Sequence, residues 1–151
     1  MRKLPEIKAA YDWFFARYKD EVDERARKND SAGIDQMEAR RDILERGVFV
    51  LMFGQFEKAV ASAFEDAMRV RATSADWNRR RGWDTASLKG RNVPFDTKLA
   101  MVLDSQSPSF GQILRTYATR NHCAHGGTSN AVGSIDALEA DLYRWRGELR
   151  S

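Results

Sequence analysis

Cysteine, proline and strand-forming runs are scarce in this sequence, and each scarcity excludes a class of structure. The chain of 151 residues has one cysteine, Cys123, so an internal disulfide is excluded and a reducing compartment is favoured. Its three prolines lie where a helix can begin or a loop can run. We find no alternating run of β-branched residues that predicts a strand. These absences favour an all-α fold.

Signals for secretion or membrane insertion are also lacking. The N-terminal residues do not form the apolar run of a signal peptide. The longest uninterrupted apolar run, residues 48–53, is far shorter than the roughly 18 residues of a membrane span. We therefore expect a cytoplasmic protein that has no membrane partner.

Hydrophobic residues make up 42% of the chain, and they recur at helical spacing. Eight Phe, four Trp and four Tyr supply apolar surface for a core, and the length is typical of one domain. We therefore expect a single helical domain over residues 1–151. The predicted helices cover residues 4 to an end within the charged stretch 25–30, about 35–68, 95–103, 110 to a stop at Gly126-Gly127, and 135–149.

The ends of these helices set the expected architecture. Ser31 or Asp35 is suited to cap the second helix, and Ser134 is suited to cap the last one. Between Thr73 and Val93 the periodicity fails, which predicts a long connection after the second helix, with a short turn of helix within it as the alternative. The prediction is an up-and-down bundle of four to five helices with a long loop between the second and third.

Positive charge is concentrated in that connection. The net charge is +3, but seven basic and two acidic residues between Arg69 and Arg91 give +5, so the other residues sum to −2. Arginines neutralise phosphates and aromatic rings stack on unpaired bases, so the segment fits RNA binding. The alternative is a solvated loop whose tryptophans anchor it to the bundle. The residues concerned are Trp77, Arg79, Arg80, Arg81 and Trp83.

Three polar residues extend the apolar rows of the fourth predicted helix. Arg120 follows Tyr117 by three positions, and His125 follows Asn121 by four. These polar groups are therefore aimed where the helix had presented apolar side chains. A buried arginine needs a partner, so one interpretation is a structural network in which Arg120 bonds a carboxylate. In that network His125 interacts with the helix C-terminus.

The segment from Arg120 to His125 reads R-N-x-x-x-H, and a glycine follows it. It resembles the signature of the HEPN superfamily, small helical domains found in many prokaryotic RNase toxins and CRISPR-associated RNases. The R-N-x-x-x-H-G form is similar to that of the family's defence-related branch. The stretch from Val48 to Glu57 is similar to that branch's apolar central helix, which ends in a glutamate. The resemblance covers roughly residues 35 to 130.

The resemblance implies a metal-independent endoribonuclease that needs no cofactor and acts as a homodimer, with two motifs facing one cleft. The family's arginine maps onto Arg120, the polar residue after it onto Asn121, and the histidine onto His125. Such toxins and defence effectors are held in check by a partner, so RNA and an antitoxin or regulatory protein are the expected partners. Some members carry a modifiable tyrosine two residues after the histidine. That position is Gly127 here, so this mode of control is not expected.

Cleavage of RNA through its own 2′-hydroxyl suits these side chains. The reaction needs a base for that proton and an acid for the leaving oxygen, and a histidine can serve as either. A guanidinium makes bidentate contacts with phosphate oxygens and offsets the developing charge. Asn121 is expected to orient His125 or to bond the phosphate. One chain supplies one motif histidine, and a dimer supplies two.

Other polar residues have supporting roles with open alternatives. Glu57 is either an ion-pair partner of Arg120 or a solvated glutamate. His122 either lines the cleft or caps the helix, and it forms a looser alternative pair with Arg115. Cys123 is expected to be a small core residue. A closed zinc site needs about four nitrogen or sulfur ligands, which two histidines and one cysteine do not supply, so no metal is predicted.

Three functions therefore compete. The first is an endoribonuclease that acts as a toxin or defence effector. The second is a non-catalytic HEPN-like module that binds nucleotides, RNA or a partner protein through the same polar cleft. The third is a helical interaction domain whose basic loop recruits nucleic acid.

Overall fold

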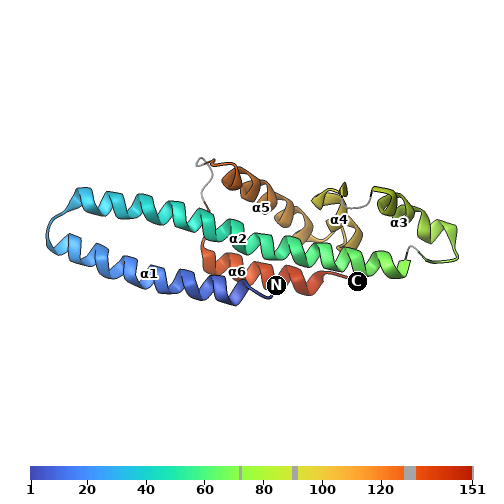
Figure 1. Cartoon of the computed structure of the whole chain (residues 1–151), viewed down its shortest axis with the longest axis horizontal. Helices are drawn as coiled ribbons and strands as arrows, with labels where there is room; N and C mark the ends of the chain where they lie inside the picture. Colours follow the sequence, from blue (N-terminus) through green and yellow to red (C-terminus); the bar gives the residue numbers. More distant parts are fainter. Residues whose placement is uncertain (72, 90–91, 128–131, 151) are drawn as a thin grey trace. The chain divides into compact units, whose positions relative to one another are not determined.

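The structure, a computed structural model, describes residues 1–71, 73–89, 92–127 and 132–150, except for the side chains of Arg79 and residues 85–89. The described residues form six helices and no strand, so the predicted all-α class is confirmed. The helices are α1 (Leu4–Arg27), α2 (Ser31–Arg71), α3 (Trp77–Lys89), α4 (Phe95–Val102), α5 (Pro108–Ala124) and α6 (Ile135–Glu148) (Figure 1).

The chain separates into two compact units. Unit 1 comprises Met1–Gln55 and Thr119–Ala140, and unit 2 comprises Phe56–Ala118 and Asp141–Ser151. Each unit buries large apolar side chains. In unit 1 these include Leu4, Tyr11, Tyr18, Phe49, Met52, Phe53 and Ile135. In unit 2 they include Phe56, Val60, Phe64, Trp83, Leu99, Ile113, Leu142 and Trp145.

In unit 1, α1 and the first part of α2 form an antiparallel hairpin (Figure 1). The hydroxyl of Tyr11 donates to Glu45 at 2.9 Å, and the hydroxyl of Tyr18 accepts from Arg41 at 3.5 Å. Later residues of α1 thus pair with earlier residues of α2, so the two helices are antiparallel. The apolar rows of the two helices face each other across this register.

Asp30 caps the start of α2. Its Oδ1 accepts a hydrogen bond from the Gly33 amide at 2.9 Å, and its Oδ2 accepts one from Arg25 at 2.9 Å. The sequence had favoured Ser31 or Asp35 for this role, so that prediction was wrong. An aspartate directly before the first helical residue satisfies an otherwise unpaired amide of the first turn.

Helix α3 lies where the sequence predicted a long loop, so that prediction is corrected. Asp76 begins the helix, because its Oδ1 accepts from the Asn78 amide at 2.9 Å. Trp83 is 8% exposed and stacks on Phe64 with ring centroids 6.2 Å apart. The sequence of the helix has no continuous apolar stripe, and among its described side chains Trp83 is the large buried one, which explains why periodicity did not reveal it.

The remaining helices agree with the sequence predictions. Helix α4 lies within the stretch 95–103 that was predicted to be helical. Helix α6 begins directly after Ser134, whose hydroxyl accepts from the Ala137 amide at 3.4 Å, as expected for a cap. Local patterns therefore located both elements.

One of the described helices, α2, contains an 18-residue window that is long and apolar enough to cross a membrane. The window is not an uninterrupted apolar run, so inspection of such runs did not reveal it, and the expectation that the protein has no membrane partner stays a prediction. Core helices of soluble proteins meet the same criterion, and 39% of this window is buried within the protein. Met52 and Phe53 of this helix are fully buried.

Candidate functional site

Helix α5 ends in a capping turn, residues 122–127, at the predicted pair of glycines. Gly126 has a φ of +80°, a left-handed conformation that glycine adopts without steric cost. Its amide donates to the Cys123 carbonyl at 3.1 Å, and the Gly127 amide donates to the His122 carbonyl at 2.9 Å. These two bonds satisfy carbonyls that the end of the helix leaves unpaired. The predicted glycine stop is therefore confirmed.

The capping turn places His125 directly after the last helical residue. Its backbone amide donates to the carbonyls of Asn121, at 3.1 Å, and His122, at 3.3 Å. The residue is nevertheless exposed, so its imidazole is accessible from solvent. The carbonyl end of a helix carries partial negative charge, which interacts favourably with a cation such as imidazolium. The backbone of this histidine is thus fixed while its side chain faces solvent.

Arg120 and Asn121 contact each other. Nη1 of Arg120 donates to Oδ1 of Asn121 at 3.0 Å. Five helical positions separate Arg120 from His125, which places them roughly 140° apart around a regular helix axis. Asn121 precedes His125 by one turn, so the guanidinium is bonded to a side chain of the row that leads to His125. The sequence predicted that Asn121 orients His125 or bonds the phosphate. In the structure, the side-chain oxygen of Asn121 accepts a hydrogen bond from Arg120.

His122 packs against the last residue of the capping turn. A Cβ atom built at Gly127 would collide with the imidazole of His122, so the ring lies against the glycine backbone. Whether His122 lines the cleft or caps the helix stays a prediction, and the observed contact is the packing of its ring on Gly127. It also gives Gly127 a packing reason to be glycine.

Arg46 of α2 reaches the same turn, and sequence reasoning did not identify it. Its Nη1 lies 3.4 Å from the Gly127 carbonyl oxygen and 3.9 Å from the Cys123 sulfur. Its guanidinium also holds Asp42 at both oxygens, with Nε 2.8 Å from Oδ2 and Nη2 3.1 Å from Oδ1. The Arg46 side chain is 13% exposed. The available signal was an aspartate four residues before an arginine at the start of an apolar run.

Asp42 and Arg46 each stabilise the charged form of the other. The hydrogen bond from Arg46 lowers the pKa of the Asp42 carboxyl, and the bond to Asp42 raises the pKa of Arg46. Both groups are therefore charged at neutral pH. The result is a fixed cation at the negative end of α5, where it stabilises the helix dipole.

An exposed apolar row of α2 lies beside the capping turn. Ile43 and Leu51 are 70% and 59% exposed, and they lie one turn before and after Gly47. A groove of about 520 Å³ connects this row with the turn. Its lining residues are Ile43, Arg46, Gly47, Val50, Leu51, Cys123, Ala124, Gly126 and Gly127.

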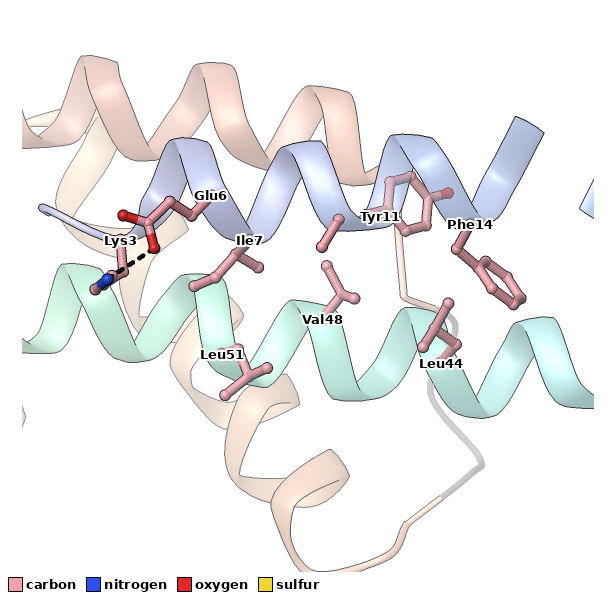
Figure 2. A pocket seen from close by; sticks show the side chains of 9 residues that line it. Lys3, Glu6, Ile7, Tyr11, Phe14, Leu44, Val48 and Leu51 are labelled. Carbon is pink, nitrogen blue, oxygen red and sulfur yellow. Dashed lines mark hydrogen bonds and ion pairs between the residues drawn. The ribbon is translucent and has the colours of Figure 1, made fainter. Parts of the chain in front are cut away.

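A second groove, of about 510 Å³, lies between α1 and α2 and shares Leu51 with the first (Figure 2). Lys3 and Glu6 form an ion pair of 2.7 Å at one end of it. Burial, together with the bond to Glu45, raises the pKa of Tyr11 to about 12, so this phenol is neutral at physiological pH. The apolar side chains lining the groove are those of Ile7, Ala10, Phe14, Leu44, Val48 and Leu51.

The residues predicted to bind RNA divide into two groups. Trp77 is 58% exposed, and the Arg80 guanidinium lies 5.7 Å from its ring centroid. Arg80 is also held by Asp84, at 3.1 Å, and Arg81 is exposed. Trp83 is buried, with Phe64 and Arg71 against its ring, so it anchors α3 instead of presenting a free face to a base. The side chain of Arg79 lies outside the described residues.

Two predicted side-chain pairs each combine a residue of unit 1 with a residue of unit 2. Glu57 and Arg115 belong to unit 2, whereas Arg120 and His122 belong to unit 1. The predicted ion pair of Glu57 with Arg120 and the alternative pair of Arg115 with His122 therefore stay predictions. Cys123 is half-buried in the capping turn.

Within the part of the chain that the structure describes, no group of three or more His, Cys, Asp or Glu residues could hold a metal ion. Comparison with known proteins gave no match to a family model, a curated protein or a solved structure. The resemblance to HEPN domains thus rests on the motif from Arg120 to Gly126 and on its helical setting.

Proposed function

We propose that this protein is a metal-independent endoribonuclease whose site consists of Arg120, Asn121 and His125. The observation that carries the proposal is the geometry at the end of α5. An exposed imidazole follows the last helical residue, and the guanidinium of Arg120 is bonded to Asn121, one turn before that imidazole. An imidazole and a guanidinium are the groups that general acid–base cleavage of a phosphodiester requires.

In the proposed reaction, the 2′-oxygen of RNA attacks the adjacent phosphorus and the bond from phosphorus to the 5′-oxygen breaks. A base accepts the 2′-hydroxyl proton, and an acid donates a proton to the departing 5′-oxygen. The products are a 2′,3′-cyclic phosphate and a 5′-hydroxyl. His125 serves as the base or the acid, and a second copy of the chain supplies the other imidazole. Arg120 offsets the charge that develops on the phosphate oxygens.

The second copy is expected to dock on the exposed row of Ile43, Gly47 and Leu51. This row adjoins the groove that ends at the capping turn, so a copy seated there would bring a second His125 near the first. Exposed apolar patches of this kind mark association surfaces. We propose that the homodimer acts in the cytoplasm as a toxin or defence effector, under the control of an antitoxin or regulatory protein.

A cleavage assay tests the activity directly. Wild type and His125→Ala are incubated with a mixed RNA pool in EDTA, and the same sequences made as DNA serve as a substrate control. We expect the wild type alone to cleave, only RNA to be cut, and the products to end in cyclic phosphate. Arg115→Ala is the matched control on α5, and its activity should be retained. Equal cleavage by His125→Ala, or loss only in Arg115→Ala, would contradict the proposed assignment.

A non-catalytic module that binds nucleotides, RNA or a partner protein is the second candidate. It is favoured by the exposed Trp77 and the arginines of α3, which suit RNA binding without any chemistry. Such a module would bind single-stranded RNA and leave it intact. If only α3 variants altered binding, and Arg120 variants did not, a helical interaction domain with a basic surface would be the better description.

A further inference from the structure

We infer that Arg46 is a positioning residue whose guanidinium fixes the turn that carries His125. No motif includes it, and it lies on a different helix, 79 positions before the histidine in the sequence. Its effect on catalysis rests on the proposed function, whereas its effect on the turn can be measured without any activity.

A chain of contacts leads from Arg46 to the histidine. Arg46 donates to the Gly127 carbonyl at 3.4 Å, and the Gly127 amide donates to the His122 carbonyl at 2.9 Å. The His125 amide donates to that same His122 carbonyl at 3.3 Å. Fixing Gly127 therefore limits the positions that the backbone of His125 can take, since both residues are bonded to one carbonyl of the last helical turn.

The guanidinium is itself held in one place. Asp42 engages two of its nitrogens, and the side chain is 13% exposed, so few other rotamers are open to it. Its third nitrogen, Nη1, faces the capping turn. The planar guanidinium binds a carboxylate with two nitrogens and reaches a carbonyl with the third. Lysine has a single side-chain nitrogen, so it can make only part of these contacts.

The first experiment measures amide hydrogen exchange by NMR in wild type, Arg46→Met and Arg46→Lys. We expect faster exchange at His125 and Gly127 in Arg46→Met, and an intermediate rate in Arg46→Lys. Arg40→Met is the matched control, because it removes the same charge from an exposed position of the same helix. Unchanged exchange in Arg46→Met would overturn the inference. Asp42→Asn retains the arginine and covers the case in which Arg46→Met fails to fold, since it should raise exchange at the same amides.

The second experiment measures cleavage kinetics in the same variants. Misplacing a reacting group by about 1 Å can lower the rate by about a hundredfold, so we expect kcat of Arg46→Met to fall at least about tenfold. KM should change much less, because the arginine does not contact the substrate. Arg46→Lys should recover part of kcat, and Arg40→Met should keep all of it.

The two experiments separate failure of the inference from failure of the proposed function. Altered exchange in a protein that cleaves no RNA would support the positioning of the turn and refute the ribonuclease. A kcat that is unchanged in Arg46→Met, despite faster exchange, would refute the positioning role in catalysis while the ribonuclease stands.

Discussion

An arginine lies at the capping turn of α5 and another lies on α3, and the two differ in how far they are exposed and in what surrounds them. At the capping turn, Arg46 is 13% exposed and bonds a carboxylate, a carbonyl and a sulfur. On α3, Arg80 is 33% exposed, bonds the Asp84 carboxylate at 3.1 Å and the Ser74 carbonyl at 2.7 Å, and lies over the exposed ring of Trp77. A fixed group suits chemistry, which requires a defined geometry. A more exposed cation beside an exposed ring suits binding, which tolerates many geometries.

Replacing His125 is the strongest test of whether the capping turn performs the chemistry while α3 binds the RNA. Loss of a general acid or base typically lowers the rate about 10²- to 10⁴-fold, so we expect His125→Ala to lose cleavage to that extent. Its affinity for single-stranded RNA should stay close to that of wild type, because α3 is unchanged. Gel-based cleavage and fluorescence anisotropy measure the two quantities. A parallel loss of affinity and cleavage would mean that one region serves both purposes.

The two tryptophans of α3 give the second test. Trp83 is buried against Phe64, so Trp83→Ala should destabilise the protein by about 3 kcal/mol or more, as deletion of a core aromatic does. Trp77 is exposed, so Trp77→Ala should leave the free energy of unfolding nearly unchanged. Its RNA binding should weaken by about 1–3 kcal/mol, the usual contribution of one stacked base. Urea denaturation and anisotropy distinguish the outcomes, and unchanged RNA affinity would remove α3 from the proposed interface.

Exposed apolar residues in the two units allow a matched test of association. Leu51 adjoins the groove at the capping turn, whereas Val70 is 71% exposed at the end of α2 in unit 2. A charge buried at an interface without a partner is strongly unfavourable, so Leu51→Asp should weaken the proposed dimer at least about tenfold. Val70→Asp should leave association unchanged. Analytical ultracentrifugation measures both, and a wild type that is monomeric at all concentrations would refute the homodimer.

Local patterns predicted much of this fold, because helix periodicity and capping residues act within a few positions. The stop at Gly126 and the cap at Ser134 were both found this way. Helix α3 was not, since its sequence has no apolar stripe to detect. The motif residues could be named from spacing. The hydrogen bond between Arg120 and Asn121 could not be predicted from spacing, because a long side chain has several possible partners within reach.

Arg46 shows why the rest of the site was beyond sequence reasoning. Its bond to the Gly127 carbonyl joins residues 81 positions apart, and a backbone carbonyl leaves no trace in residue identity. What the sequence did contain was the pair of Asp42 and Arg46, four positions apart. Many such pairs are simply solvated, so spacing alone gave no reason to single this one out.

The smallest expected effect concerns two aspartate–arginine pairs, one in each region. Arg46 lowers the pKa of Asp42 in the folded protein, so the pair stabilises the fold above the unfolded pKa near 3.8. That contribution is lost as the pH falls through the lower, folded pKa. Asp42 is half-exposed, so solvent screens the effect and it should be modest.

Thermal unfolding between about pH 7 and pH 2 should therefore show wild type melting above Asp42→Asn at neutral pH, with the gap closing only in strong acid. Asp84→Asn, which breaks the pair with Arg80 on α3, provides the comparison. Both substitutions should lower Tm slightly at neutral pH, but only Asp42→Asn should also speed amide exchange at Gly127. If the gap does not narrow as the pH falls below 3.8, or if Asp84→Asn disturbs the turn equally, Asp42 does not hold the guanidinium in place and the contrast between the two regions fails.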